Sequence, residues 1–162
     1  MQGLKDMKMY SIEQVSHLPI TLDEAWHFFS RPENLNEITP DDMSFQIITD
    51  VADKKMHAGM IIEYKISPFA GVKMNWVTEI SHCVDRQFFV DEQRFGPYAF
   101  WHHQHHFEAV PGGVRMTDIV HYGLPLGFLG RIAHALFVRK KLEGIFAYRT
   151  VRVAQLFPDS SK

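Results

Sequence analysis

Four histidines stand within five consecutive positions of the segment 101–107. If this segment is a β-strand, its side chains face opposite sides of a sheet in alternation. One face then carries Trp101, His103, His105 and Phe107, and the other carries His102, Gln104, His106 and Glu108. Because the second set is entirely polar, we expect it to face solvent and the first set to face the interior.

An aspartate is expected to share that interior face. Asp118 interrupts the apolar side of the next strand, which is formed by Val114, Met116, Val120 and Tyr122. An unpaired carboxylate in an apolar interior costs several kcal/mol, so we expect His103 or His105 to pair with Asp118. Burial raises the pKa of an aspartate and lowers that of a histidine, whereas pairing favours both charged forms. We call His103, His105 and Asp118 the polar strip. Asp91 and Gln93 can extend it, but Phe88 and Val90 are apolar residues of the same strand, so the pattern does not decide which side of that strand faces the interior.

Three kinds of chemistry suit this polar strip. The strip can orient the polar end of an otherwise apolar ligand, or it can be a hydrogen-bonded network that binds nothing. In the third interpretation, His103 or His105 is a general acid or base that Asp118 orients.

A metal site is a further interpretation of the same residues. His103 and His105 project to the same side about 6–7 Å apart, and Asp118 can supply a third ligand. No HExxH motif supports this reading, and His102 and His106 on the other face favour only adventitious binding. We therefore expect neither a metal nor a cofactor.

The composition narrows the class of protein. The net charge of −2 provides no basic field for nucleic acid. Cys83 is the only cysteine, so an internal disulfide and a multi-cysteine zinc site are excluded. No apolar N-terminal run indicates a signal peptide, and the apolar stretch 124–138 is too short for stable membrane insertion. We expect a cytoplasmic protein.

The pattern along the 162 residues predicts a single domain, 1–162, of the α+β class. A strand at 9–18 is followed by a short helix that begins at the capping box Thr21–x–x–Glu24 and ends before Pro32. A second short helix begins at Pro32. Period-two alternation then predicts strands at 44–50, 60–67, 72–80, 87–94, 98–110 and 114–123.

The last segment predicts one helix of about 25 residues. Its apolar positions recur near helical spacing at Leu129, Ile132, Leu136, Leu142, Phe146, Val153 and Leu156. The expected fold is therefore a curved antiparallel sheet of about seven strands, in β-α-α-β6-α order, wrapped around a long C-terminal helix. Such a sheet tends to leave a gap beneath the helix, and gaps of this kind hold ligands.

The sequence resembles the helix-grip superfamily of Bet v 1 allergens, START lipid-transfer domains and polyketide cyclase/dehydratase-like proteins (SRPBCC). Within it, the chain is most similar to the small bacterial ligand-binding group that also occurs fused to epimerase-like domains. The resemblance covers nearly the whole chain and rests on these matches: Ala25-Trp26, Phe28-Phe29, Asn34-Leu35, Ile38-Thr39-Pro40, Gly59, Tyr64, 76–80, Asp91-x-Gln93, Gly96-Pro97, Trp101-x-His103-x-His105-x-Phe107, Asp118, Tyr122-x-Leu124-Pro125-x-Gly127 and Phe146-x-x-Arg149. It implies binding of hydrophobic or amphipathic small molecules.

Our leading hypothesis is a non-catalytic binder that carries or presents a lipid, quinone or polyketide-like compound between the sheet and the C-terminal helix. The expected binding residues are Trp76, Asp91, Gln93, Trp101, His103, His105, Phe107, Met116, Asp118, Tyr122, Phe146 and Arg149. One alternative is an acid/base cyclase or dehydratase that uses His103 or His105 with Asp118. The other is a partner-binding domain with a filled core. The sequence identifies no partner enzyme.

Overall fold

The computed structural model describes residues 7–52, 54–69 and 71–158. Within them, seven strands form one antiparallel sheet in the order β1-β7-β6-β5-β4-β3-β2. The strands are β1 (Met9–Leu18), β2 (Gln46–Ile47), β3 (Met60–Phe69), β4 (Val72–Val84), β5 (Phe88–Phe95), β6 (Phe100–Val110) and β7 (Gly113–Gly123). The helical elements are α1 (Leu22–Phe29), the 3-10 helices η1 (Pro32–Ile38) and η2 (Asp41–Met43), α2 (Gly127–Ala133), the π-helical turn η3 (His134–Val138) and α3 (Arg139–Leu156).

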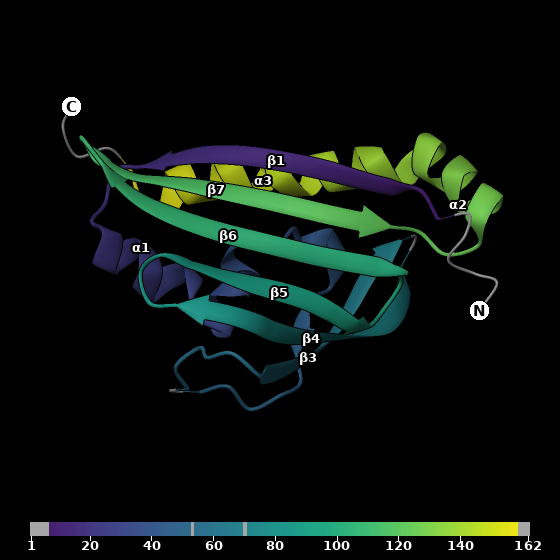
Figure 1. The fold of residues 1–162 in the computed structure, drawn as a ribbon, viewed down its shortest axis with the longest axis horizontal. Coiled ribbons are helices and arrows are strands. Elements are labelled where there is room, and N and C mark those ends of the chain that lie inside the picture. Colours follow the sequence, from purple (N-terminus) through teal and green to yellow (C-terminus); the bar gives the residue numbers. More distant parts are fainter. Residues whose placement is uncertain (1–6, 53, 70, 159–162) are drawn as a thin grey trace.

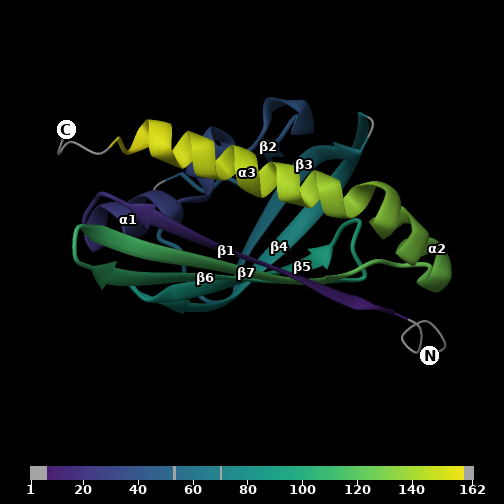
Figure 2. The same ribbon diagram turned by 90° about the horizontal axis from the view of Figure 1, so that it is seen from above.

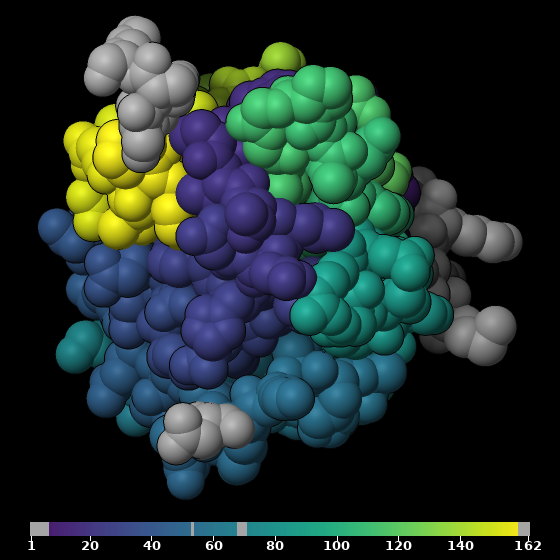
Figure 3. Space-filling model, turned by 90° about the vertical axis from the view of Figure 1, so that its left-hand side faces the viewer, coloured from purple at the N-terminus to yellow at the C-terminus, as the bar shows by residue number. Residues whose placement is uncertain are grey.

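The sheet curves around α3, which runs along its concave side (Figures 1 and 2). This arrangement confirms the predicted α+β fold and its element order. At one end, α1 and the 3-10 helices close the space between the sheet and α3. Figure 3 looks onto that end, where the purple and blue atoms of α1 and the turns after it lie between the yellow end of α3 and the teal and green strands.

Helix α1 begins where the capping box predicted. The Thr21 hydroxyl accepts a hydrogen bond from the Glu24 backbone N–H at 3.2 Å, and the Glu24 carboxylate accepts one from the Thr21 backbone N–H at 2.8 Å. These two bonds satisfy donors that the first turn of a helix otherwise leaves unpaired. The helix ends at Phe29, and Pro32 opens η1 as expected.

The predicted strand at 44–50 is wrong in length, because only Gln46 and Ile47 pair with β3. The backbone N–H groups of Ile48 and Thr49 both point to the Glu63 carbonyl, at 2.8 and 3.4 Å. The Thr49 hydroxyl then accepts the Glu63 N–H at 2.8 Å, in the place of a backbone carbonyl. The chain therefore leaves the sheet after Ile47.

The single C-terminal helix that we expected is confirmed, since α2, η3 and α3 follow one another without a gap, and it contains the π-helical turn η3. Buried positions step by four residues through this region, at Gly130, His134, Val138, Leu142 and Phe146. A step of four exceeds the 3.6 residues of an α-helical turn, and the wider π-helical turn takes up the difference.

The predicted apolar stripe is consequently wrong at its N-terminal end. Leu129 and Leu136 are 62% and 73% exposed, and Ile132 is also exposed. Leu142, Phe146 and Val153 are buried against the sheet side as expected.

None of the helices in the described residues is long and apolar enough to cross a membrane.

Two glycines lie at the turn of the β6–β7 hairpin, which is close to the end of β1. Gly112 and Gly113 have φ angles of +85° and +148°, which side-chain-bearing residues rarely adopt. A Cβ atom on Gly113 would lie 2.0 Å from the Leu18 carbonyl oxygen of β1, whereas one on Gly112 would meet nothing within 4 Å. Gly113 therefore lets β1 approach the hairpin.

We predict that Gly113→Ala destabilises the protein more than Gly112→Ala. Gly112→Ala incurs only backbone strain and lowers the free energy of unfolding by about 1–2 kcal/mol. Gly113→Ala adds a steric conflict with β1, worth about 1–3 kcal/mol more. Urea denaturation of both variants measures the difference. Equal losses in the two variants would contradict the close approach of β1.

Candidate functional site

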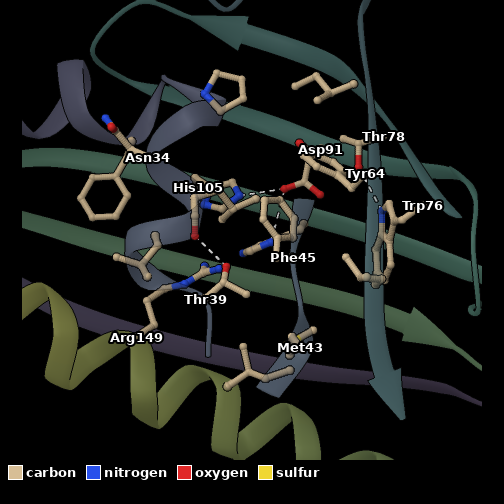
Figure 4. A pocket seen from close by; sticks show the side chains of 18 of the residues that line it. Asn34, Thr39, Met43, Phe45, Tyr64, Trp76, Thr78, Asp91, His105 and Arg149 are labelled. Carbon is tan, nitrogen blue, oxygen red and sulfur yellow. Dashed lines mark hydrogen bonds and ion pairs between the residues drawn. The ribbon is translucent and has the colours of Figure 1, made fainter. Parts of the chain in front are cut away.

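A cavity of about 180 Å³ lies between the concave face of the sheet and α3. Most of its lining is apolar and aromatic, and one corner is polar. It is lined by Phe28, Phe29, Arg31, Pro32, Asn34, Leu35, Ile38, Thr39, Met43, Phe45, Met56, Ile62, Tyr64, Ile66, Trp76, Thr78, Ile80, Phe89, Asp91, Tyr98, Trp101, His103, His105, Lys141, Leu142, Ile145, Phe146 and Arg149. Figure 4 shows part of this wall.

Aromatic side chains fix one part of the wall. The ring of Trp76 packs edge-on against Trp101 with centroids 5.3 Å apart, and Tyr98 lies 4.8 Å from Trp101. The indole N–H of Trp76 donates to the Thr78 hydroxyl at 3.0 Å. The indole N–H of Trp101 donates to Oδ1 of Asp91 at 3.2 Å. These bonds leave the apolar ring surfaces on the cavity and turn both indole N–H groups to protein partners.

In the polar corner of the cavity, the imidazoles of two histidines lie between the carboxylates of two aspartates. On one side, Oδ2 of Asp91 lies 2.8 Å from Nε2 of His105 and 3.3 Å from Nδ1 of His103. On the other side, Oδ1 of Asp118 lies 3.0 Å from Nε2 of His103 and 2.8 Å from Nδ1 of His105. We call these four residues the His–Asp cluster. Each imidazole therefore contacts Asp91 through one ring nitrogen and Asp118 through the other.

Only two of the four contacts are hydrogen bonds, that of His103 Nε2 with Asp118 and that of His105 Nε2 with Asp91. Nδ1 of His103 lies near Asp91 and Nδ1 of His105 lies near Asp118 without hydrogen-bond geometry, so these two contacts are electrostatic. The other ring nitrogen of His105 is hydrogen-bonded to Asp91, and Figure 4 marks that bond.

The sequence places these groups through strand alternation. His105 of β6 stands directly opposite Asp118 of β7, and Asp91 of β5 stands opposite His103. Both histidines and Asp118 are buried, as the alternating pattern predicted. The ring of Phe89 stacks on His105 with centroids 4.1 Å apart, and the ring of Phe146 from α3 lies 5.9 Å from His103.

Burial alone would raise the pKa values of both carboxyls in the cluster. For Asp118, the close contacts and positive charge of His103 and His105 outweigh burial and hold its pKa far below the usual value. The pKa of Asp91 is lowered as well, because the charge of His103 and the hydrogen bond from His105 outweigh burial. Both aspartates are therefore ionised at neutral pH.

The two imidazoles differ in pKa. Burial lowers the pKa of His105, but its contacts with Asp118 and Asp91 outweigh burial and raise the value overall. Burial and the positive charge of His105 together lower the pKa of His103 despite the same carboxylates. With ring centroids 3.8 Å apart, a proton on one ring disfavours a second proton on the other. His105 therefore holds a proton more tightly than His103.

Arg149 reaches from α3 into the polar corner (Figure 4). Its side chain is 14% exposed, and its terminal nitrogen lies 4.0 Å from Oδ1 of Asp118. Its guanidinium also lies over the Phe146 ring at 5.5 Å. Its Nε is buried without a hydrogen-bond partner among the described residues. An unpaired buried donor is unusual and identifies a place where an acceptor group would be stabilised.

The structure distributes the twelve expected binding residues between the cavity and its surroundings. Trp76, Asp91, Trp101, His103, His105, Phe146 and Arg149 line the cavity. Asp118 is 2% exposed and lies behind the two histidines.

The other four expected binding residues do not line the cavity. Phe107 and Met116 belong to the core cluster around α1, where Phe107 packs edge-on against Trp26. Tyr122 bonds through its hydroxyl to His134 at 2.8 Å, and its pKa is raised to about 12, chiefly by burial. Gln93 holds the turn after β5, since its side chain bonds both the backbone N–H and the carbonyl of Tyr98.

The two histidines on the outer face of β6 do not line the cavity. His102 contacts Glu92 at 2.9 Å, and His106 contacts Gln104 at 2.9 Å. Both histidines are half-buried on the side of the sheet away from the cavity. They thus belong to the polar face that alternation assigned to solvent.

A further part of the wall, which no sequence pattern predicted, comes from α1, the 3-10 helices and the loop after them. Phe28, Phe29, Leu35, Ile38 and Phe45 all line the cavity. The only signal was the density of apolar residues in 25–45, which equally indicates ordinary packing.

Solved structures share the fold at low sequence identity. The protein CV1439 from Chromobacterium violaceum gives a TM-score of 0.69 at 15% identity, covering 91% of this chain and 96% of that one. The major latex-like protein 151 from Panax ginseng gives 0.66 at 12% identity, covering 92% and 97%. Ara h 8.0201 gives 0.56 at 17% identity, covering 91% and 99%.

The chain has the Bet v 1-like helix-grip fold. No protein-family model and no curated protein sequence matches it. At these identities the likeness concerns the fold alone, and a function has to be argued from the cavity and the His–Asp cluster.

We predict that Asp118→Ala lowers the free energy of unfolding by about 3–5 kcal/mol, because it removes the carboxylate that both buried imidazoles contact. Glu108→Ala is the matched control. Glu108 is an exposed carboxylate of the same hairpin that pairs with Arg115, and its loss costs no more than about 1 kcal/mol. Urea denaturation at neutral pH measures both. A loss in Asp118→Ala as small as in the control would contradict the tight pairing within the cluster.

Proposed function

We propose that this protein binds an amphipathic small molecule in the cavity between its sheet and α3, and that it carries or presents this ligand. The compound classes that fit are lipids, quinones and polyketide-like molecules. The observation that carries the proposal is the combination of a mainly apolar cavity with a cluster of charged and polar side chains, Asp91, His103, His105 and Arg149, in its wall. Cavities of this kind take up an apolar body and use a few polar groups to orient it. The helix-grip resemblance of the sequence implies the same activity.

The polar corner also indicates which end of the ligand it receives. Arg149 presents a buried Nε that has no hydrogen-bond partner in the part of the chain that the structure describes, and its guanidinium lies near the ionised Asp118. A ligand oxygen next to Arg149 would satisfy that donor, and an anionic oxygen would do so most strongly. We infer a carboxylate or an enolate-like oxygen at the polar end, with the hydrocarbon part against Trp76, Trp101 and Phe28.

An acid/base enzyme is the second candidate, and one observation favours it. Both His103 and His105 line the cavity, and their pKa values shift in opposite directions, which suits one proton donor and one proton acceptor. This reading requires a reactive ligand atom within hydrogen-bond reach of an imidazole. The third alternative, a partner-binding domain with a filled core, disagrees with the cavity.

We predict that amphipathic ligands stabilise the protein against unfolding. Dodecanoate and a panel of quinones and aromatic polyketides serve as probes, with thermal unfolding and the fluorescence of Trp76 and Trp101 as readouts. At 100 times its dissociation constant, a ligand adds about 2.7 kcal/mol to the free energy of unfolding.

A matched pair of variants locates the binding. Ile145→Trp fills the cavity from α3 and should abolish stabilisation, whereas Val151→Trp adds bulk to an exposed position of the same helix and should not. The proposal fails if no compound of the panel stabilises the wild-type protein and native mass spectrometry finds no co-purified ligand. It also fails if both variants respond to ligand alike.

A second prediction concerns Arg149. Arg149→Met removes the donor but keeps the apolar stem, so it should weaken dodecanoate binding about 10–100-fold, the equivalent of one charged hydrogen bond. Binding of dodecanol, which has the same chain without the charge, should change less than about threefold. Isothermal titration calorimetry measures both affinities. Equal losses for the acid and the alcohol would show that Arg149 does not contact the polar end.

A further inference from the structure

Three potential metal ligands converge at the cavity side of the His–Asp cluster. One carboxylate oxygen of Asp91 and one ring nitrogen each of His103 and His105 all lie within 4.8 Å of one another. The two measured contacts to Oδ2 of Asp91 are 2.8 and 3.3 Å. Ligand atoms bound at about 2.0–2.2 Å to one metal ion are themselves about 3–3.5 Å apart, whether the geometry is octahedral or tetrahedral. The two contacts of Asp91 are therefore close to the spacing of neighbouring corners of a coordination shell, and the two ring nitrogens lie within 4.8 Å of each other.

The opposite side of each imidazole supplies a second and independent observation. Metal-bound histidines almost always direct their other ring nitrogen to a carboxylate or carbonyl, which fixes the tautomer and the ring orientation. Here Nε2 of His103 and Nδ1 of His105 both contact Oδ1 of Asp118, at 3.0 and 2.8 Å. A single buried carboxylate thus takes the outer position for both imidazoles.

The surroundings hold these groups in place and leave one side open. Phe89 stacks on His105, and the indole N–H of Trp101 holds the remaining oxygen of Asp91. All three potential ligands line the cavity, while Asp118 lies behind them. Three protein ligands on one side and a cavity on the other is the arrangement of sites that bind an exogenous molecule at the metal.

The charges of the cluster are consistent with a cation. Two carboxylates face the four ring nitrogens of His103 and His105. A divalent cation between Asp91 and the two nitrogens nearest to it would offset the charge of both carboxylates.

We propose that Asp91, His103 and His105 bind one divalent transition-metal ion, with Asp118 as the outer carboxylate that positions both histidines. Two imidazoles and one carboxylate select Zn²⁺, Fe²⁺ or Co²⁺ over Mg²⁺ and Ca²⁺, which prefer oxygen ligands. The metal site considered from the sequence had Asp118 as the third ligand. In the structure the third ligand is Asp91, because β5 turns Asp91 toward the cavity. The open positions of the metal face the volume assigned to the polar end of the ligand.

The first test is metal binding by chelator-treated full-length protein. Equilibrium dialysis with Zn²⁺, read by elemental mass spectrometry, should give one ion per chain. Mg²⁺ in the same experiment should give none above background. Asp91→Ala and His105→Ala should each weaken Zn²⁺ binding more than about 100-fold, and Asp118→Asn about 10–100-fold. Circular dichroism checks that each variant is folded.

The matched control is the double variant His102→Ala/His106→Ala, which removes two histidines of the same strand from the outer face. It should keep the full affinity and stoichiometry. Zn²⁺ binding that is absent in the wild-type protein, unaffected by His105→Ala or lost in the double control would each overturn the proposal.

Cobalt provides a readout that does not depend on variants that fold. Co²⁺ bound to the wild-type protein should give visible d–d bands and two paramagnetically shifted imidazole N–H signals, one from the ring nitrogen that each histidine turns toward Asp118. No such shifted pair would argue against two histidine ligands. Dodecanoate binding by the metal-free protein separates this proposal from the proposed function, since either can fail while the other holds.

Discussion

The buried charge of Asp118 is the constraint on which the rest of the site depends. A carboxylate that is 2% exposed in an apolar interior is tolerated only if it is paired. Its partners are two imidazoles delivered by alternate positions of the neighbouring strand, and these in turn contact Asp91 on the next strand. Three adjacent strands are thereby tied to one register, because a shift by one residue would turn every member of the cluster to the opposite face.

Strand alternation and capping made much of this predictable from sequence. The polar set His102, Gln104 and His106 identified the outer face of β6, and the interruption at Asp118 identified the charge that needed a partner. The facing of Asp91 could not be predicted, since β5 pairs with β4 through two register shifts and Phe89 and Val90 are consecutive buried residues. A bulged strand does not obey a period of two.

The cavity could not be predicted from the amino-acid composition, because its existence depends on how the helices pack against the sheet. Its sheet wall follows from alternation and α3 supplies a second wall, but the rest comes from α1 and the 3-10 helices, where apolar residues pack in no regular period. The C-terminal helix shows the same limit. Its apolar residues at 129–136 repeat with helical spacing, yet the π-helical turn at His134–Val138 shifts the buried face and leaves Leu129 and Leu136 outside.

The two walls of the cavity also differ in how readily they can open. The strands are joined by ladders of backbone hydrogen bonds, whereas the backbone of η1 and η2 has the poorer hydrogen bonds of 3-10 turns and few residues there are buried. Side-chain contacts join these two turns to Phe28, Lys141 and Arg152. Local unfolding of such a segment costs less than disruption of the sheet. A ligand that left by the Pro32–Met43 side would therefore require no separation of β5, β6 and β7. The lifetime of a complex would then be set by a short segment of the chain and not by the stability of the whole domain.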